Sequence, residues 1–214
     1  MSIHRNHRFC ENGGGECPCE PFTMDINPFL NYLSSIHPLS EGFRKFAAKD
    51  IKEEFYTKNQ VILGAGQIAN RLWFIRKGFA MEYSYRKKDK LPYRFWNEGE
   101  IMVDVSSFFK QAPSEGYIEI QETSNLLAIN YEQMQFLLQQ FPETHIIVRT
   151  IIEEYHNYAE KKALDLLTLS SEERYLQLLR APYILQKAST ENIAAFLGVS
   201  RKTLSRIRAK RNHK

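Results

Sequence analysis

The chain has 214 residues, 43% of them hydrophobic, and a formal net charge of +4 at pH 7. This composition excludes an intrinsically disordered chain, and the length suits one large domain or two modest ones. No apolar run approaches the roughly 20 residues of a membrane span, and the N-terminus lacks the apolar stretch of a signal peptide. We therefore expect a cytoplasmic protein with no membrane partner.

The charge is concentrated near the C-terminus. Residues 170–214 hold ten Lys and Arg against three Asp and Glu, whereas the rest of the chain holds 19 against 22. A basic module on a near-neutral body indicates that this module binds a polyanion.

Residues 1–23 contain three consecutive glycines and little apolar patterning, which predicts a disordered extension. All three cysteines, Cys10, Cys17 and Cys19, lie in this segment. An iron–sulfur cluster usually needs four thiolate ligands, so we expect solvent-exposed thiols, with no metal and no cofactor.

Residues 24–141 are predicted to form the first folded domain. Helical apolar spacing begins at 27–37 and 40–49, with Asn27 and Ser40 as expected N-caps. Short β-favouring runs then follow one another, punctuated by glycines. They are residues 60–63, 71–75, 80–85, 93–96, 101–105, 117–121 and 126–129. Such spacing predicts an antiparallel double-stranded β-helix, or jelly roll, with residues 86–90 as an exposed hairpin tip.

Aromatic residues are dense in these runs, and we expect them to fill the interior of the roll, because small barrels are filled by side chains. They are Trp73, Phe74, Phe79, Tyr83, Tyr85, Tyr93, Phe95 and Trp96.

A short helix at 131–139 leads to one long helical pattern, about 143–167, within the segment 142–168. Its apolar residues recur every three or four positions as a single stripe. They are Val148, Ile151, Ile152, Tyr155, Tyr158, Ala159 and Leu166. The stripe can pack on the roll or form a coiled-coil dimer seam, and we expect a dimerisation helix. Ser170 and Glu173 then form a capping-box pattern that starts another helix.

Residues 190–207 have the pattern of a helix-turn-helix, in a predicted C-terminal domain of residues 169–214. Thr190 and Ser200 are the expected N-caps, and Gly198 lies at the turn, where glycine adopts a left-handed backbone most readily. Apolar residues fall at positions that would hold the two helices together. They are Ile193, Leu197, Val199, Leu204 and Ile207, beside the small Ala194.

The second of these helices presents basic and hydroxyl side chains away from the apolar set, as a major-groove recognition helix must. We expect base contacts from Arg201, Thr203, Ser205 and Arg206, and contact with a base or a phosphate from Lys202. Phosphate contacts are expected from Ser200, Arg208 and Lys210.

An enzyme is the rival class of function. The six histidines are His4, His7, His37, His145, His156 and His213, so no imidazole falls in the predicted strands, where a metal-binding barrel needs one. No nucleophile elbow, phosphate loop or HExxH motif occurs either. We therefore predict a protein that is not an enzyme.

The order of β-roll, long helix and helix-turn-helix resembles the Crp/Fnr family of bacterial transcription regulators. Four segments carry the resemblance: 72–83 (LWFIRKGFAMEY), 96–109 (WNEGEIMVDVSSFF), 169–179 (LSSEERYLQLL) and 193–208 (IAAFLGVSRKTLSRIR). The resemblance implies an α+β fold and a homodimer joined through the long helix. It further implies a sensory roll that controls helix-turn-helix units on a near-palindromic DNA site.

The sequence departs from that family at two places. Cyclic-nucleotide binders of the family use a Gly-Glu pair and later an arginine that clamps the phosphate. The matching positions here hold Val103-Asp104 and Ser114-Glu115, so we expect no cyclic AMP binding. The family usually has a β-hairpin wing after the recognition helix, and here we expect a short form without that wing.

The sequence thus predicts a sequence-specific, DNA-binding transcription regulator of the Crp/Fnr type. It leaves open an unknown small-molecule effector, to which we assign no ligand-binding residues. The alternative is a small-molecule-binding β-roll sensor whose C-terminal helices contact proteins and not DNA.

Overall fold

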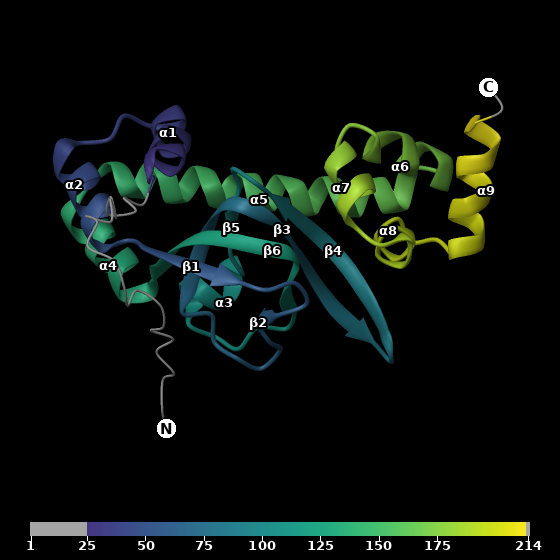
Figure 1. Cartoon of the computed structure of the whole chain (residues 1–214), viewed down its shortest axis with the longest axis horizontal. Helices are drawn as coiled ribbons and strands as arrows, with labels where there is room; N and C mark the ends of the chain where they lie inside the picture. The colour runs from purple at the N-terminus through teal and green to yellow at the C-terminus, as the bar shows by residue number, and fades with distance from the viewer. Residues whose placement is uncertain (1–24, 213–214) are drawn as a thin grey trace, which may run out of the picture.

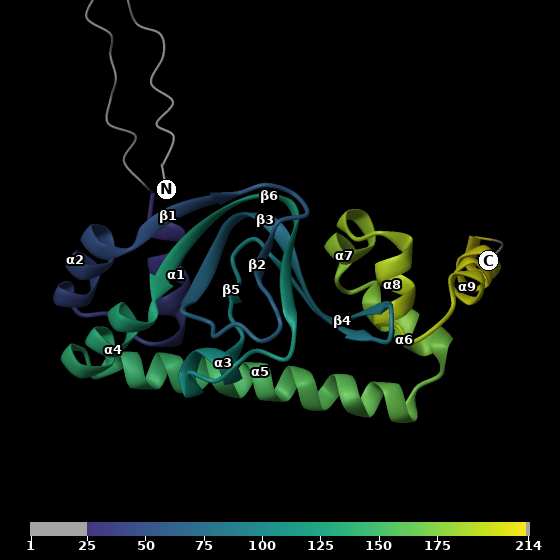
Figure 2. The same cartoon turned by 90° about the horizontal axis from the view of Figure 1, so that it is seen from below.

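The computed structural model describes residues 25–212 (Figure 1). The predicted extension at residues 1–23, with its three cysteines, lies outside the described residues. A curled antiparallel sheet lies at the centre, the helix α5 (Glu143–Thr168) runs along its side, and helices α6 to α9 gather at one end (Figures 1 and 2). The predicted α+β class is confirmed.

The sheet is built around two long strands, β3 (Arg71–Arg86) and β6 (Tyr117–Asn130). Its order is β1-β6-β3-β4, with β2 paired to β6 and β5 to β3, all antiparallel. The shorter strands are β1 (Lys52–Tyr56), β2 (Val61–Leu63), β4 (Asp89–Asn97) and β5 (Ile101–Met102). The tip between β3 and β4 is exposed, as predicted.

The β3 strand bends without ending, so the predicted division into 71–75 and 80–85 is wrong. Its register shifts around Gly78, whose φ of +128° few other residues adopt. A Cβ at this position would come within 2.0 Å of Ser124 Oγ on β6. Glycine is therefore required here both by the backbone conformation and by the close approach of two strands.

Two further strand predictions need correction. The predicted strand 101–105 ends at Met102, because the Asp104 carboxylate accepts a hydrogen bond from Ser107 N (2.9 Å) and caps α3 (Val105–Lys110). Residues 117–121 and 126–129 belong to the one strand β6. The sequence pattern also did not predict β1. Its charged and apolar residues do not alternate regularly, but its backbone pairs with β6.

Three helices close one end of the roll: α1 (Asn27–Ile36), α2 (Glu41–Asp50) and α4 (Tyr131–Gln140). Ser40 caps α2 as expected, since its Oγ accepts from Phe43 N at 3.2 Å. Asn27 does not cap α1. It is the first helical residue, and its own N–H donates to Asp25 Oδ1.

The aromatic residues of the strands divide between two cores, which corrects the expectation that all of them fill the roll. Trp73, Phe74 and Trp96 lie inside the roll. Phe79 and Phe95 belong instead to a second cluster that joins the roll to the C-terminal helices. Tyr85 and Tyr93 are 48% and 38% exposed. The roll and the C-terminal unit therefore share buried apolar surface.

The long helix α5 uses more than the one apolar stripe predicted for it. Val148, Ile151 and Tyr155 pack against the core of the roll, and the Tyr155 hydroxyl donates to Ile101 O (2.6 Å). Leu167, by contrast, is 83% exposed. Although α5 has 26 residues, no helix within residues 25–212 is long and apolar enough to cross a bilayer.

The C-terminal helices follow in quick succession. They are α6 (Ser171–Leu178), α7 (Pro182–Lys187), α8 (Thr190–Phe196) and α9 (Arg201–Asn212). The predicted capping box of α6 is confirmed: Glu173 N donates to Ser170 Oγ (3.3 Å) and Ser170 N donates to Glu173 Oε2 (2.8 Å).

Candidate nucleic-acid interface

The helices α8 and α9 meet through a tight turn at Gly198, which has a φ of +67°. The Ser200 hydroxyl accepts from Thr203 N at 3.1 Å and starts α9, as predicted. The expected cap of α8 is wrong by one residue: Ser189 accepts from Asn192 N, and Thr190 is the first helical residue. The sequence pattern thus placed the turn correctly and the first helix boundary one residue late.

Apolar side chains on one side of α9 pack against the neighbouring C-terminal helices. Leu204 is fully buried and Ile207 is 9% exposed. They pack in the same cluster as Ile193 of α8 and Tyr175 of α6. Burying this side of α9 leaves the opposite side free to face solvent.

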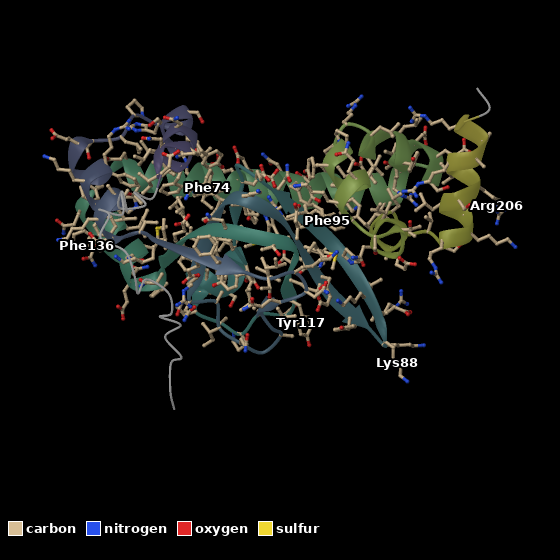
Figure 3. The ribbon with its side chains drawn as sticks, viewed as in Figure 1. Phe74, Lys88, Phe95, Tyr117, Phe136 and Arg206 are labelled. Atoms are coloured by element: carbon tan, nitrogen blue, oxygen red, sulfur yellow. The ribbon has the colours of Figure 1, made fainter. Side chains whose placement is uncertain are left out.

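The solvent-facing side of α9 carries the residues that the sequence singled out. Arg201, Lys202, Ser205, Arg206 and Lys210 are exposed, whereas Thr203 and Arg208 are half-buried. The helix stands at the end of the long axis of the molecule, with Arg206 pointing away from the body (Figure 3). Nothing in the described residues covers this surface.

Two of these cations are already paired with carboxylates that the sequence analysis did not single out. Arg201 Nη1 lies 2.5 Å from Glu191 Oε1, and Lys210 Nζ lies 2.9 Å from Glu172 Oε1. The pKa of Glu191 is lowered, first by its own backbone N–H and then by the hydrogen bond from Arg201. Exposed ion pairs contribute little, so a phosphate can displace either carboxylate. Their partners are 10 and 38 residues away in sequence, and only the fold brings them together.

Strand β3 carries a buried acidic group near Asp104. Glu82 is 8% exposed, and burial together with the charge of Asp104 raises its pKa to about 8. Tyr93 hydrogen-bonds to Glu82, and Ser114 Oγ accepts from Gly116 N (3.1 Å). The sequence analysis found Ser114 and missed Glu82, because a glutamate in a strand gives no signal of burial.

The charge of Arg94 on β4 opposes the effect of burial on the pKa of Glu82, while the guanidinium packs against α5. Its guanidinium lies 3.5 Å from the ring centroid of Tyr155 and 4.6 Å from that of Tyr158, both on α5. These contacts fasten the roll to α5 through cation–π attraction. Among residues 25–212, no three His, Cys, Asp or Glu side chains gather as they would to hold a metal.

Comparison with known proteins finds a related domain family and related folds. Residues 53–141 match the cyclic nucleotide-binding domain family. By sequence, no curated protein matches the chain. Solved structures do match the chain.

A transcriptional regulator of the Crp/Fnr family from Eubacterium rectale has a TM-score of 0.67 and 15% identity, covering 83% of this chain and 85% of that one. FixK2 from Bradyrhizobium japonicum has a TM-score of 0.66 and 15% identity, covering 75% and 83%. CLP of Xanthomonas campestris, a c-di-GMP-responsive global regulator, has a TM-score of 0.62 and 18% identity, covering 80% and 90%. At these identities the likeness shows a shared fold.

Proposed function

We propose that this chain, which has the fold of the Crp/Fnr regulators, is a dimeric transcription regulator that reads a near-palindromic DNA site with α9. The observation that carries the proposal is the basic, solvent-facing side of α9 on a helix-turn-helix whose other side is buried. We assign sensing to residues 24–141, dimerisation to 142–168 and DNA binding to 169–214. A DNA-binding role also supports a cytoplasmic location.

The positions of the residues on the exposed side of α9 support base contacts for some of them and phosphate contacts for others. Arg201 and Arg206 extend from the first two turns, where a recognition helix approaches base edges, and an arginine can donate bidentately to guanine. Ser205 and the half-buried Thr203 lie between them and can reach bases at closer range. Lys202 is free of carboxylate partners among residues 25–212 and can reach a base or a phosphate.

Residues at the edges of the helix suit phosphate contacts, which position a protein without reading sequence. Ser200 is at the helix start, while Arg208 and Lys210 lie toward its end. Lys210 must leave Glu172 to do so, which is a small cost for an exposed pair.

A second face of α5 supports dimerisation with another copy of the chain. Ile152, Ala159, Ala163 and Leu167 follow one another at spacings of seven, four and four residues, which places them on one side of a helix. This side differs from that of Ile151, which packs on the roll. A two-fold dimer along α5 would present two α9 helices to two half-sites.

The buried acid in the roll supports a regulator that does not respond to cyclic nucleotides. A cyclic phosphate would meet Glu82, Asp104 and Glu115, where related domains supply an arginine. Losing a buried charged partner lowers affinity by thirtyfold or more, at about 2–5 kcal/mol. Calorimetry that detects cyclic AMP binding in the low micromolar range would contradict this part of the proposal.

The DNA-binding role is tested by selecting binding sites from random duplexes with the purified full chain. We expect enrichment of a near-palindrome, then weaker binding of Arg206→Ala to the selected site by about 1–3 kcal/mol, with random duplex little affected. The matched variant Lys210→Ala should instead weaken binding to both duplexes and flatten the salt dependence.

Failure of the wild-type chain to enrich any sequence would reject the proposal and favour the sensor whose C-terminal helices contact proteins. If Arg206→Ala weakened both duplexes equally, its assigned role as a base reader would be wrong.

A further inference from the structure

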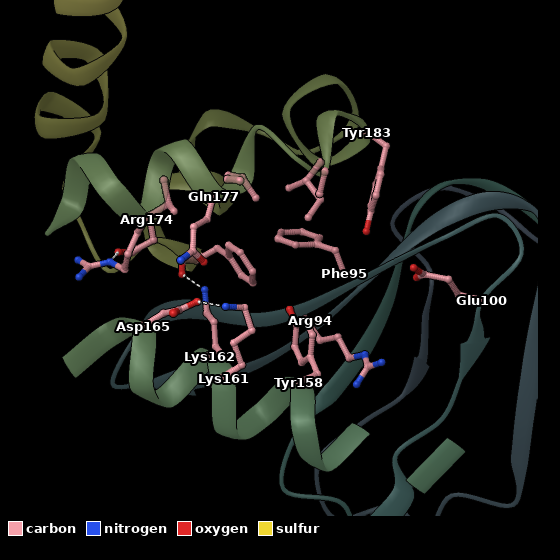
Figure 4. A pocket seen from close by; sticks show the side chains of 15 residues that line it. Arg94, Phe95, Glu100, Tyr158, Lys161, Lys162, Asp165, Arg174, Gln177 and Tyr183 are labelled. Atoms are coloured by element: carbon pink, nitrogen blue, oxygen red, sulfur yellow. Dashed lines mark hydrogen bonds and ion pairs between the residues drawn. The ribbon is translucent and has the colours of Figure 1, made fainter. Parts of the chain in front are cut away.

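A cavity of about 330 Å³ lies between the C-terminal half of α5, the helices α6 to α8 and strand β4 (Figure 4). Its size falls within the range of small-molecule sites, roughly 300–1,000 Å³. It lies outside the interior of the roll and away from the exposed side of α9. Neither the DNA interface nor the acidic group around Glu82 uses it.

One wall of the cavity is aromatic. The rings of Phe95 on β4 and Phe196 on α8 are 5.0 Å apart between centroids, and Tyr183 of α7 lines the same space. Figure 4 shows Phe95 and Tyr183 on the same side of this space. Flat aromatic surfaces of this kind suit the body of an aromatic or aliphatic molecule.

The other end of the cavity is cationic. Lys161, Lys162 and Arg174 line it, and Asp165, the carboxylate at this end, lies 3.7 Å from Lys161. The second lining carboxylate, Glu100, sits at the far end beside Tyr183 (Figure 4). Arg94 also lines the cavity and lies close enough to act electrostatically on the Glu100 carboxylate. Positive charge is therefore in excess where α5 faces α6.

Lys162 is the cation best placed to meet a ligand. Its ammonium donates to Phe196 O at 2.7 Å and lies 3.2 Å from the centroid of the Phe196 ring. Lysine has three donors, and within residues 25–212 this is the only hydrogen bond that its ammonium makes. Burial, and then the charge of Arg174, lower its pKa to about 8. An anion beside it would stabilise the charged form.

We propose that this cavity binds a small organic anion, with its acidic group at Lys162 and its apolar body against Phe95, Phe196 and Tyr183. The acidic group can be a carboxylate, phosphate or sulfonate, since each accepts hydrogen bonds from an ammonium. The apolar body supplies the rest of the affinity through burial against the aromatic wall.

The cavity is connected to the reading helices. Lys162 and Arg174 hold two carbonyls at the end of α8, those of Phe196 and Leu197, at 2.7 and 3.0 Å. The turn into α9 follows directly at Gly198. A ligand that accepts from the free donors of Lys162 binds the same ammonium that holds the Phe196 carbonyl, so ligand binding and the position of α9 are coupled. This consequence rests on the proposed DNA-binding role, whereas binding of the anion does not.

Two fluorescent dyes that differ in charge provide the test, without DNA. We would titrate the full chain with 8-anilinonaphthalene-1-sulfonate and with its uncharged analogue, N-phenyl-1-naphthylamine. The wild-type chain should bind the sulfonate saturably. Lys162→Met keeps the length of the side chain and removes its charge, so it should weaken the sulfonate about tenfold or more and leave the uncharged dye nearly unchanged.

Two further variants control for misfolding of Lys162→Met and for the loss of a lysine elsewhere. Gln177→Trp fills the cavity and keeps Lys162, so it should weaken both dyes even if Lys162→Met fails to fold. Lys49→Met removes an exposed lysine from α2 and should bind both dyes as the wild-type chain does.

The proposal is overturned if the wild-type chain does not bind the sulfonate, or if Gln177→Trp binds both dyes unchanged. It is also overturned if Lys162→Met weakens the two dyes equally. A chain that binds the sulfonate as expected but selects no DNA sequence would keep this site and reject the proposed function.

Discussion

The cations on the exposed side of α9 differ in the partners that they have in the free chain. Arg201 is held by Glu191, whereas Arg206 points into solvent (Figure 3). If α9 binds DNA as proposed, the Glu191 carboxylate competes with the DNA for Arg201 and repels the phosphate backbone. Arginines that look alike in the sequence therefore differ in the partners that they have before binding.

Replacing Glu191 by Gln should raise affinity for all duplexes roughly two- to fivefold at low salt, because a competing exposed ion pair is lost. The gain should shrink as salt is added, since salt screens exposed charges. Fluorescence anisotropy at several salt concentrations would measure it. Glu132→Gln, an exposed carboxylate on α4, is the matched control and should change nothing. Unchanged affinity of Glu191→Gln at low salt would show that the pair does not limit binding.

The buried Glu82 predicts an unusual dependence of stability on pH. Its pKa is raised from 4.5 to about 8, so the native state retains a proton that the unfolded state loses. The free energy of unfolding therefore falls as pH rises from about 4.5 to about 8 on account of this group. Glu82→Gln removes the titration and keeps an acceptor for the Tyr93 hydroxyl.

Urea unfolding should find Glu82→Gln close to the wild-type chain at pH 4.5 and more stable by about 1 kcal/mol or more at pH 8. Glu132→Gln is again the control, with no expected pH-dependent difference. An equal difference at both pH values would show that Glu82 has the same pKa in the folded and the unfolded state.

At the scale of elements, α5 shows what a helical pattern can and cannot predict. The length of α5 follows from the spacing of its apolar residues, and the start of α6 follows from its capping box. The division of its apolar residues into two faces does not, because Ile151 and Ile152 are adjacent in sequence but lie 100° apart around the helix. Only the position of the roll decides which of them is covered.

The exposed face of α5 gives a prediction for this element. Ile152→Glu with Leu167→Glu should give monomers, because two charges would be buried in the seam. Ile146→Glu is the matched control: Ile146 is 41% exposed on the same helix, about a third of a turn from this face, and the variant should stay dimeric. Light scattering distinguishes the masses. A double variant that remains a dimer would place the interface elsewhere.

Local signals predicted the turn at Gly198, the cap at Ser200 and the exposed side of α9, since each depends on residues within one or two turns. The strand bend at Gly78 escaped prediction because it depends on the approach of Ser124 from β6. The cavity at Lys162 escaped for the same reason, as its walls come from β4, α5, α6, α7 and α8. Contacts between distant segments leave no periodic trace in a sequence.

For the whole molecule, the shared core is the feature with most consequence. Phe79 and Phe95 of the roll pack with Tyr183 and Phe196 of the C-terminal helices. Lys187 reinforces the junction through Glu122 at 3.0 Å. The roll and the C-terminal helices are thus joined through buried contacts, so a change in the position of one biases the position of the other. Under the proposed function, these contacts would let the roll influence α9.

The proposed function requires two copies of this chain to bind one DNA site with their α9 helices. Sedimentation of the full chain with a duplex carrying the selected sequence tests it most directly. A second duplex with about five base pairs inserted between the half-sites turns one of them to the opposite face of the DNA. We expect two chains on the first duplex, and an affinity for the second duplex no better than for random DNA. One chain per duplex at saturation, or equal affinity for the two spacings, would contradict the proposed function.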